Sequence, residues 1–199
     1  MEIERVILDD TMETRDVMDF MPLIHEMNIT RKFSCFQDFP PNFHHQLTKY
    51  PNKIHISCSF WFSINQLLNC TCTRIKLHES MFTNQDLDVF LQKWKTRGAF
   101  PNLRWLEIRN RKIDNESPIL EMIPPITTAN NPKIKVSICN YSRDDIVDGV
   151  RVTNDDGKEG WLKVLELPLS EEPEKFVAFI PRSNGNLSEL IEVQFLNFP

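Results

Sequence analysis

Glycine is scarce in this chain of 199 residues, which contains only five. The five do not form a phosphate-binding loop or a dinucleotide-binding fingerprint, because both motifs need closely spaced glycines. No nucleophile elbow of the form G-x-S-x-G is present either. The sequence therefore lacks the commonest signatures of nucleotide-binding proteins and hydrolases. We expect neither an enzyme nor a bound cofactor.

Long apolar runs are also absent. No stretch approaches the roughly 18 consecutive apolar residues of a membrane-spanning helix. The start of the chain, Met1–Arg5, has no apolar signal-peptide core. We therefore expect an intracellular protein, cytoplasmic or nuclear, without a membrane partner. The net charge of −5 argues against nucleic-acid binding driven by phosphate neutralisation.

Cysteine occurs five times, at positions 35, 58, 70, 72 and 139. The odd number and the apolar surroundings favour buried, reduced thiols. The C-x-C pair does not have zinc-ligand spacing, and neither His-Glu pair has the second histidine of a zinc protease, so we predict no metal site. A distant alternative is a Cys-His hydrolase built from Cys58 or Cys72 with His55 or His78.

Short strand-like segments recur along the chain with the L-x-x-L-x-L spacing of leucine-rich repeats. Their anchor positions are Val6, Phe33, Ile54, Ile75, Leu106 and Ile134. Helix-like segments lie between them, near residues 13–27, 41–50, 63–69, 83–97 and 117–123. Strands alternating with helices indicate an α/β fold. We predict an irregular leucine-rich-repeat-like solenoid with a parallel sheet in anchor order and helices on one side.

Two of these helices have clear start signals. Ser63 and Gln66 have the spacing of a capping box, and so do Thr83 and Asp86. After the second box, apolar residues recur at i, i+3, i+4 and i+7 up to Trp94, which forms one apolar helix face. We therefore expect Trp94 to pack in the core.

The pattern changes after residue 142. The stretch 150–167 predicts a hairpin around an Asp-Gly turn, and 176–180 and 191–195 predict further strands. We assign residues 1–142 to a repeat-like α/β region. Residues 143–199 form a small β-rich C-terminal cap of the same domain, as repeat stacks require at an open end.

A longer pattern in the middle of the chain resembles a known family. It comprises Trp61–Leu68, Arg74–Leu77, Thr83–Trp94 and Pro101–Ile108. Together these segments closely resemble the type-2 F-box-associated domain, a module greatly expanded in nematodes, and the resemblance covers roughly residues 53–167.

The resemblance implies a protein-interaction module, the substrate-recognition part of an SCF-type ubiquitin ligase. The F-box itself is not seen, because the chain begins directly at a strand. A Skp1-type adaptor is therefore expected only if an F-box exists upstream. The alternative is a stand-alone repeat-type scaffold without a ubiquitin role.

Side chains between the apolar strand positions should line the outer face of the sheet. The residues that we predict to bind a partner there are His55, Arg74, Lys76, His78, Trp105, Glu107, Arg109 and Lys135. They form a mostly basic stripe around one tryptophan, which we expect to be exposed and to act as an aromatic anchor. Such a stripe suits an acidic or phosphorylated segment of a protein substrate. The alternative is that these are ordinary solvated strand residues.

Overall fold

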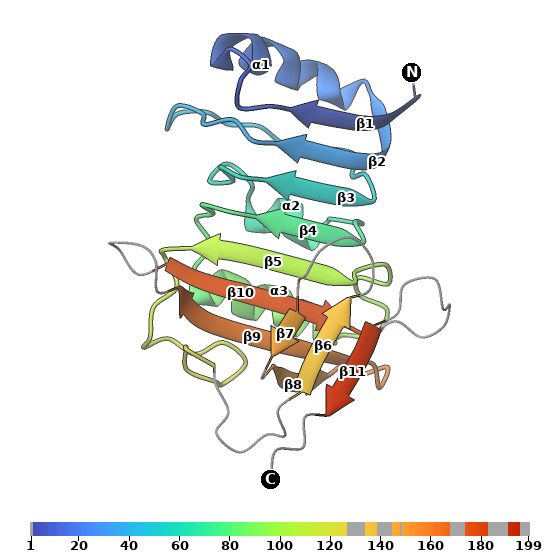
Figure 1. The fold of residues 1–199 in the computed structure, drawn as a ribbon, viewed down its shortest axis with the longest axis vertical. Coiled ribbons are helices and arrows are strands. Elements are labelled where there is room, and N and C mark those ends of the chain that lie inside the picture. Colours follow the sequence, from blue (N-terminus) through green and yellow to red (C-terminus); the bar gives the residue numbers. More distant parts are fainter. Residues whose placement is uncertain are drawn as a thin grey trace.

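The computed structural model describes residues 2–126, 134–138, 145–147, 149–167, 174–182 and 191–195. Its main feature is one mixed eight-stranded sheet with few helices (Figure 1). The strands, in spatial order, are β1 (Glu2–Leu8), β2 (Asn28–Cys35), β3 (Lys53–Ile56), β4 (Arg74–Leu77), β5 (Trp105–Asn110), β10 (Glu174–Pro181), β9 (Glu159–Leu167) and β8 (Val150–Thr153).

The first five strands are parallel and follow one another in sequence order. Their predicted anchors lie in one row: Val6 pairs with Phe33, Phe33 with Ile54, Ile54 with Ile75, and Ile75 with Leu106. The prediction of parallel neighbours is therefore confirmed as far as β5. Period-two alternation explains the common register, because a slip of one residue would move every apolar side chain to the wrong face.

The prediction was wrong for the strand anchored at Ile134. This strand, β6 (Ile134–Ile138), lies in a separate three-stranded sheet between β11 (Ile191–Phe195) and β7 (Asp145–Val147). The second neighbour of β5 is instead β10, which runs antiparallel to it. An apolar pattern marks a strand but does not choose its partner. The main sheet is thus mixed and not the wholly parallel sheet that we expected.

The later strands were located correctly. β8 and β9 pair antiparallel around the turn at Gly157, whose φ of +73° suits glycine. Both strands, together with β10, continue the main sheet beyond β5. The predicted cap region therefore contributes three strands to the same sheet.

The two helices with capping boxes are confirmed. α2 (Ile64–Leu68) begins after Ser63, and α3 (Asn84–Lys95) begins after Thr83, each with both capping-box hydrogen bonds. The segment 13–27 forms α1 (Thr14–Phe20) followed by the 3₁₀ helix η1 (Met21–His25), which contains a proline in its first turn. Among the described residues, no helix combines the length and apolar character needed to cross a membrane.

The helices predicted at 41–50 and 117–123 are not formed. In the first segment the chain turns at Phe43, whose ring stacks on Phe39 at a centroid distance of 3.9 Å. In the second, Ile119 and Met122 exchange backbone hydrogen bonds across a tight turn, and Leu120 has a positive φ. Aromatic packing in the first segment and turn hydrogen bonds in the second favour a non-helical backbone over the helix that the sequence pattern predicted.

The core lies between the sheet and the helices α2 and α3, which both lie behind the sheet in Figure 1. Trp94 is only 1% exposed, as predicted, and its ring meets that of Phe179 edge-on at 4.8 Å. A Cβ at Gly160 would lie 2.8 Å from the Phe179 ring and 3.3 Å from the Trp94 ring. Glycine at this position allows the helix to approach β9 closely.

Candidate functional site

The outer face of the sheet, opposite α2 and α3, carries the predicted site residues in registered rows. Lys53 pairs with Arg74, and Arg74 with Trp105. In the next row His55 pairs with Lys76, and Lys76 with Glu107. Because alternate side chains of a strand share one face, these rows project to the same side.

A buried carboxylate, Glu107, brings several of these residues together. Its oxygens accept from Lys76 Nζ at 3.0 Å and His78 Nε2 at 2.9 Å, and Arg109 lies 3.4 Å away. The Glu107 side chain is 3% exposed. Burial alone would raise its pKa, but the hydrogen bonds and charges of His78 and Lys76 outweigh burial and lower the pKa to about 2. Glu107 is therefore ionised and neutralises part of the basic stripe.

Trp105 is buried, with 2% of its surface exposed, so the prediction of an exposed aromatic anchor was wrong. Arg74 and Lys76 lie over its ring, with their charged groups 5.3 and 5.9 Å from the ring centroid. The long cationic side chains cover the indole, which alternation along one strand could not reveal. Glu107 is also buried, so neither residue offers a free surface to a partner.

The two histidines of the predicted site are neighbours. The rings of His55 and His78 are 5.3 Å apart at their centroids. Burial, helped by the charges of His78 and Lys76, lowers the pKa of His55 to about 4. Its Nε2 atom is buried and has no hydrogen-bond partner. His55 is therefore neutral at pH 7.

Lys135 lies on β6, which belongs to the separate sheet and is not a neighbour of β5. The side chain of Lys135 lies outside the described residues. The other seven predicted residues share one face, as the alternation along their strands predicted.

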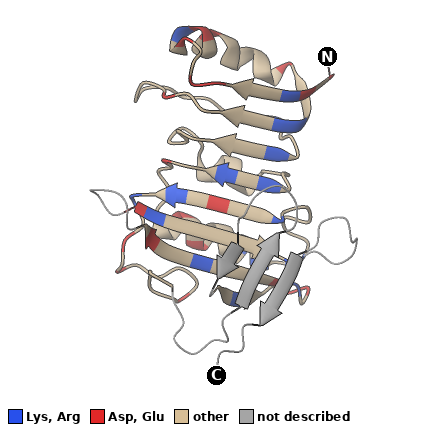
Figure 2. Ribbon diagram, in the orientation of Figure 1, with Lys and Arg blue, Asp and Glu red and all other residues tan. Residues whose placement is uncertain are grey.

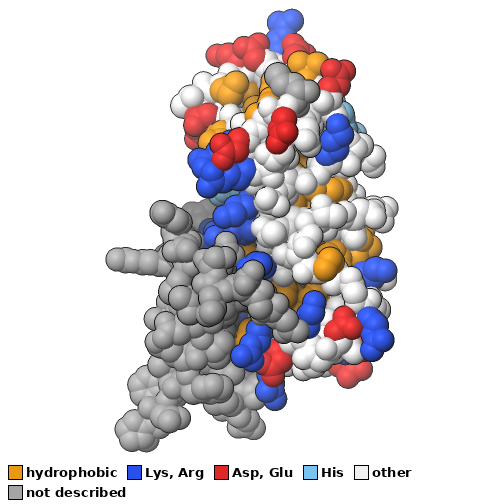
Figure 3. Space-filling view, turned by 90° about the vertical axis from the view of Figure 1, so that its right-hand side faces the viewer, with side chains coloured by type: hydrophobic (Ala, Val, Ile, Leu, Met, Phe, Trp, Pro, Cys, Tyr) orange, Lys and Arg blue, Asp and Glu red, His pale blue; other side chains and the backbone are white. Residues whose placement is uncertain are grey.

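A basic hollow of about 600 Å³ lies beside this group, over β1 to β4. It is lined by Arg5, Arg31, Lys32, Lys53, Ile54, His55, Arg74 and Lys76. Figure 2 shows blue segments one below another near the starts of β1 to β4, and Figure 3 shows Lys and Arg side chains gathered along its left edge, which is the face seen in Figure 1. Lys32 was missed as a site residue because β2 was recognised only weakly. The register with Lys53 reveals it.

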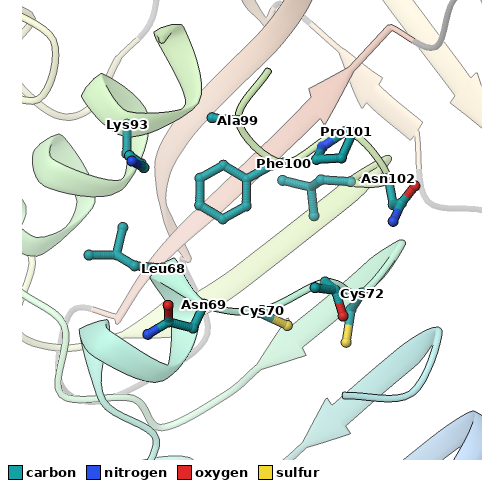
Figure 4. Close-up of a pocket in the computed structure, with 11 residues that line it drawn as sticks. Leu68, Asn69, Cys70, Cys72, Lys93, Ala99, Phe100, Pro101 and Asn102 are labelled. Atoms are coloured by element: carbon teal, nitrogen blue, oxygen red, sulfur yellow. The ribbon is translucent and has the colours of Figure 1, made fainter. Parts of the chain in front are cut away.

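A smaller hollow of about 270 Å³ lies at the end of α2 (Figure 4). The Phe100 ring extends toward α3 and α2, where Lys93 and Leu68 lie, and Cys70 and Cys72 lie farther along the wall. The Phe100 ring also packs on Phe90 at a centroid distance of 4.9 Å. Among the described residues, Lys93 is the one charged residue that lines this hollow. The other lining residues are apolar or uncharged, so we do not assign the hollow a binding role.

The described cysteines are free and buried, as predicted, and Cys139 lies outside the described residues. Burial raises the pKa of the Cys72 thiol, which donates to the Pro51 carbonyl at 2.8 Å. Burial also raises the pKa of Cys58. Protonated thiols are poor nucleophiles, so these environments do not favour a Cys-His pair.

One group of potential metal ligands occurs among the described residues. Asp38, Cys58 and Glu79 follow the ends of β2, β3 and β4, and their ligand atoms lie within 4.8 Å of one another. Burial is the main cause of the raised pKa of Cys58, and the charges of Glu79 and Asp38 add to it.

One segment of the chain that contributes to this face is similar to a known family. Residues 42–108 match the family described as F-box associated. The match covers β3, α2, β4, α3 and most of β5, and it confirms the resemblance up to residue 108. Residues 109–167, to which the resemblance was also extended, lie outside the match. Within the F-box-associated segment lie Lys53, Arg74 and the buried Glu107, whereas Arg5 and Lys32 lie outside it. No curated protein and no solved structure matches the chain.

Proposed function

We propose that this chain is a protein-interaction module that serves as the substrate-recognition part of an F-box-type ubiquitin ligase. The F-box-associated match at residues 42–108 carries the proposal, because it covers β3, β4 and most of β5, which are neighbouring strands of the outer face. Such a domain implies binding to another protein in general. A partner would bind the outer face at β1 to β4, where basic side chains line a hollow.

Proximity labelling with the intact protein tests this role. We expect labelling of ubiquitin-ligase subunits together with a set of partner proteins. The double variant Lys32→Glu and Lys53→Glu should reduce labelling of the partners and leave that of the ligase subunits unchanged. The control, Lys49→Glu with Lys93→Glu, changes the net charge equally away from the hollow.

The competing function is a stand-alone scaffold. It predicts that labelling of partner proteins depends on Lys32 and Lys53, and that no ubiquitin-ligase subunits are labelled. That result would overturn the ubiquitin role. A hydrolase using Cys58 or Cys72 would instead require one cysteine to react much faster than the others with a thiol probe.

A further inference from the structure

Four cations occupy equivalent positions on four neighbouring strands. Arg5 pairs in register with Lys32, Lys32 with Lys53, and Lys53 with Arg74. All four line the basic hollow. We call them the cationic row. Neighbouring strands lie about 4.8 Å apart, so the row spans about 14 Å across the sheet.

Like charges directly opposite each other on adjacent strands destabilise a sheet. Within the described part of the chain, Arg5, Lys32 and Lys53 form no salt bridge, whereas Arg31 at the edge of the hollow is paired with Glu4. Burial is the main cause of the lowered pKa of His55, and the charges of Lys76 and Lys32 add to it. A bound anion would relieve this repulsion.

We propose that the cationic row binds an extended acidic segment of a partner protein that crosses β1 to β4 approximately at right angles to the strands. The inference rests on the proposed protein-interaction function and adds the chemistry and direction of the bound segment. In an extended chain, side chains on one side repeat about every 6.6 Å. Three acidic residues at alternate positions therefore span about 13 Å, close to the length of the row.

Charge favours a polypeptide over a nucleic acid at this site. The whole chain carries a net charge of −5, which opposes a long polyanion whose charge extends beyond the hollow. A short acidic segment places its charges only over the row. The hollow, at about 600 Å³, has room for a few side chains.

Fluorescence anisotropy with the full chain tests the row. The probe is a labelled peptide, Ser-Glu-Ser-Glu-Ser-Glu-Ser, measured at roughly 0.15 M salt, where distant charges are screened. A peptide of the same composition with its three glutamates adjacent is the reference. We expect Lys32→Gln with Lys53→Gln to weaken binding of the alternating peptide about tenfold, because it removes the two central charges. The matched variant Lys49→Gln with Lys93→Gln should change it less than about twofold.

Three results would overturn the proposal. In the first, both double variants weaken peptide binding equally. In the second, the alternating peptide binds no more tightly than the reference peptide. In the third, a phosphoserine peptide or a single-stranded oligonucleotide binds more tightly than the alternating peptide. If the peptide does not bind but ubiquitin-ligase subunits are still labelled, the cationic row is not the binding site, and the proposed function is unaffected. If the peptide binds in a way that depends on the row but no ligase subunits are labelled, the ubiquitin role is wrong, and the row remains a binding site.

Discussion

At the scale of single residues, the carboxylate of Glu107 changes the character of the outer face. It lies among Lys76, His78 and Arg109 and takes up part of their charge. The same strand carries Trp105, which Arg74 and Lys76 cover. The other members of the cationic row, Arg5, Lys32 and Lys53, lie farther along the sheet, on β1 to β3.

Replacing Glu107 by Gln should destabilise the fold by about 2–3 kcal/mol, because it leaves clustered cations without their counter-charge. The value lies below that for a fully buried pair because Arg109 is 41% exposed. Urea unfolding at pH 7 measures the change. Glu4→Gln is the control, since its pair with Arg31 is exposed and should contribute much less to stability. Equal effects of the two substitutions would contradict the role of Glu107.

His55 makes the stability depend on pH. Its pKa is about 4 in the folded state against an ordinary value of 6.5. As the pH falls through this window, the unfolded state takes up a proton that the folded state does not, so the free energy of unfolding decreases. Between pH 7 and 5 the wild type should lose on the order of 1 kcal/mol more than His55→Gln.

Denaturant unfolding of both proteins at the two pH values measures this difference. His45 also has a pKa lowered to about 4 by burial, but it is present in both proteins and cancels in the comparison. If the free energy of unfolding of the two proteins changes equally between pH 7 and pH 5, the fold does not hold His55 neutral.

At the scale of elements, α3 shows how a local signal and a tertiary contact reinforce each other. The Thr83 and Asp86 capping box begins the helix, and the apolar face from Leu87 to Trp94 is buried. Trp94 then meets Phe179 of β10, a strand far away in sequence. The helix thereby joins the parallel strands to the antiparallel part of the sheet.

Trp94→Ala should destabilise the protein by roughly 3–5 kcal/mol, as expected for a large aromatic side chain in a packed core. The matched control on the same helix is Val89→Ala, because Val89 is 44% exposed and should change stability by no more than about 0.5 kcal/mol. Thermal or urea unfolding gives both values. A small effect at Trp94 would mean that α3 is not packed as described.

At the scale of the whole molecule, the cationic row crosses the first four strands of the sheet. Its register depends on the alignment of all four strands, so no single element creates it. Repulsion within the row is a cost to folding that binding of an anion would offset. Stability and binding should therefore change in opposite directions when the row is neutralised.

Lys53→Gln should raise the free energy of unfolding by about 0.5 kcal/mol, because it removes the charge between Lys32 and Arg74. The gain should shrink as salt is added, since salt screens the repulsion. Urea unfolding at low and high salt measures it. Lys49→Gln, an exposed lysine outside the row, should show no such salt-dependent gain. Loss of stability in Lys53→Gln would indicate that Lys53 is already neutralised.

The sequence by itself determined the local features of this protein. Capping boxes and period-two alternation depend only on near neighbours, so the starts of α2 and α3 and the inward-facing apolar positions of the first five strands were predictable. The resemblance to the F-box-associated family was also recognisable, and residues 42–108 match that family. The helices expected at 41–50 and 117–123 failed where aromatic packing or turn hydrogen bonds outweighed weak helical patterns.

Only the tertiary structure decided which strands meet and which side chains remain open to solvent. The pairing of β5 with β10 joins segments distant in sequence, and an apolar pattern does not specify its partner. Trp105 is buried, and the charged groups of Arg74 and Lys76 from the adjacent strand lie over its ring. The cationic row likewise exists only when four strands are placed in register, because its members are far apart in the sequence and become neighbours only across the sheet.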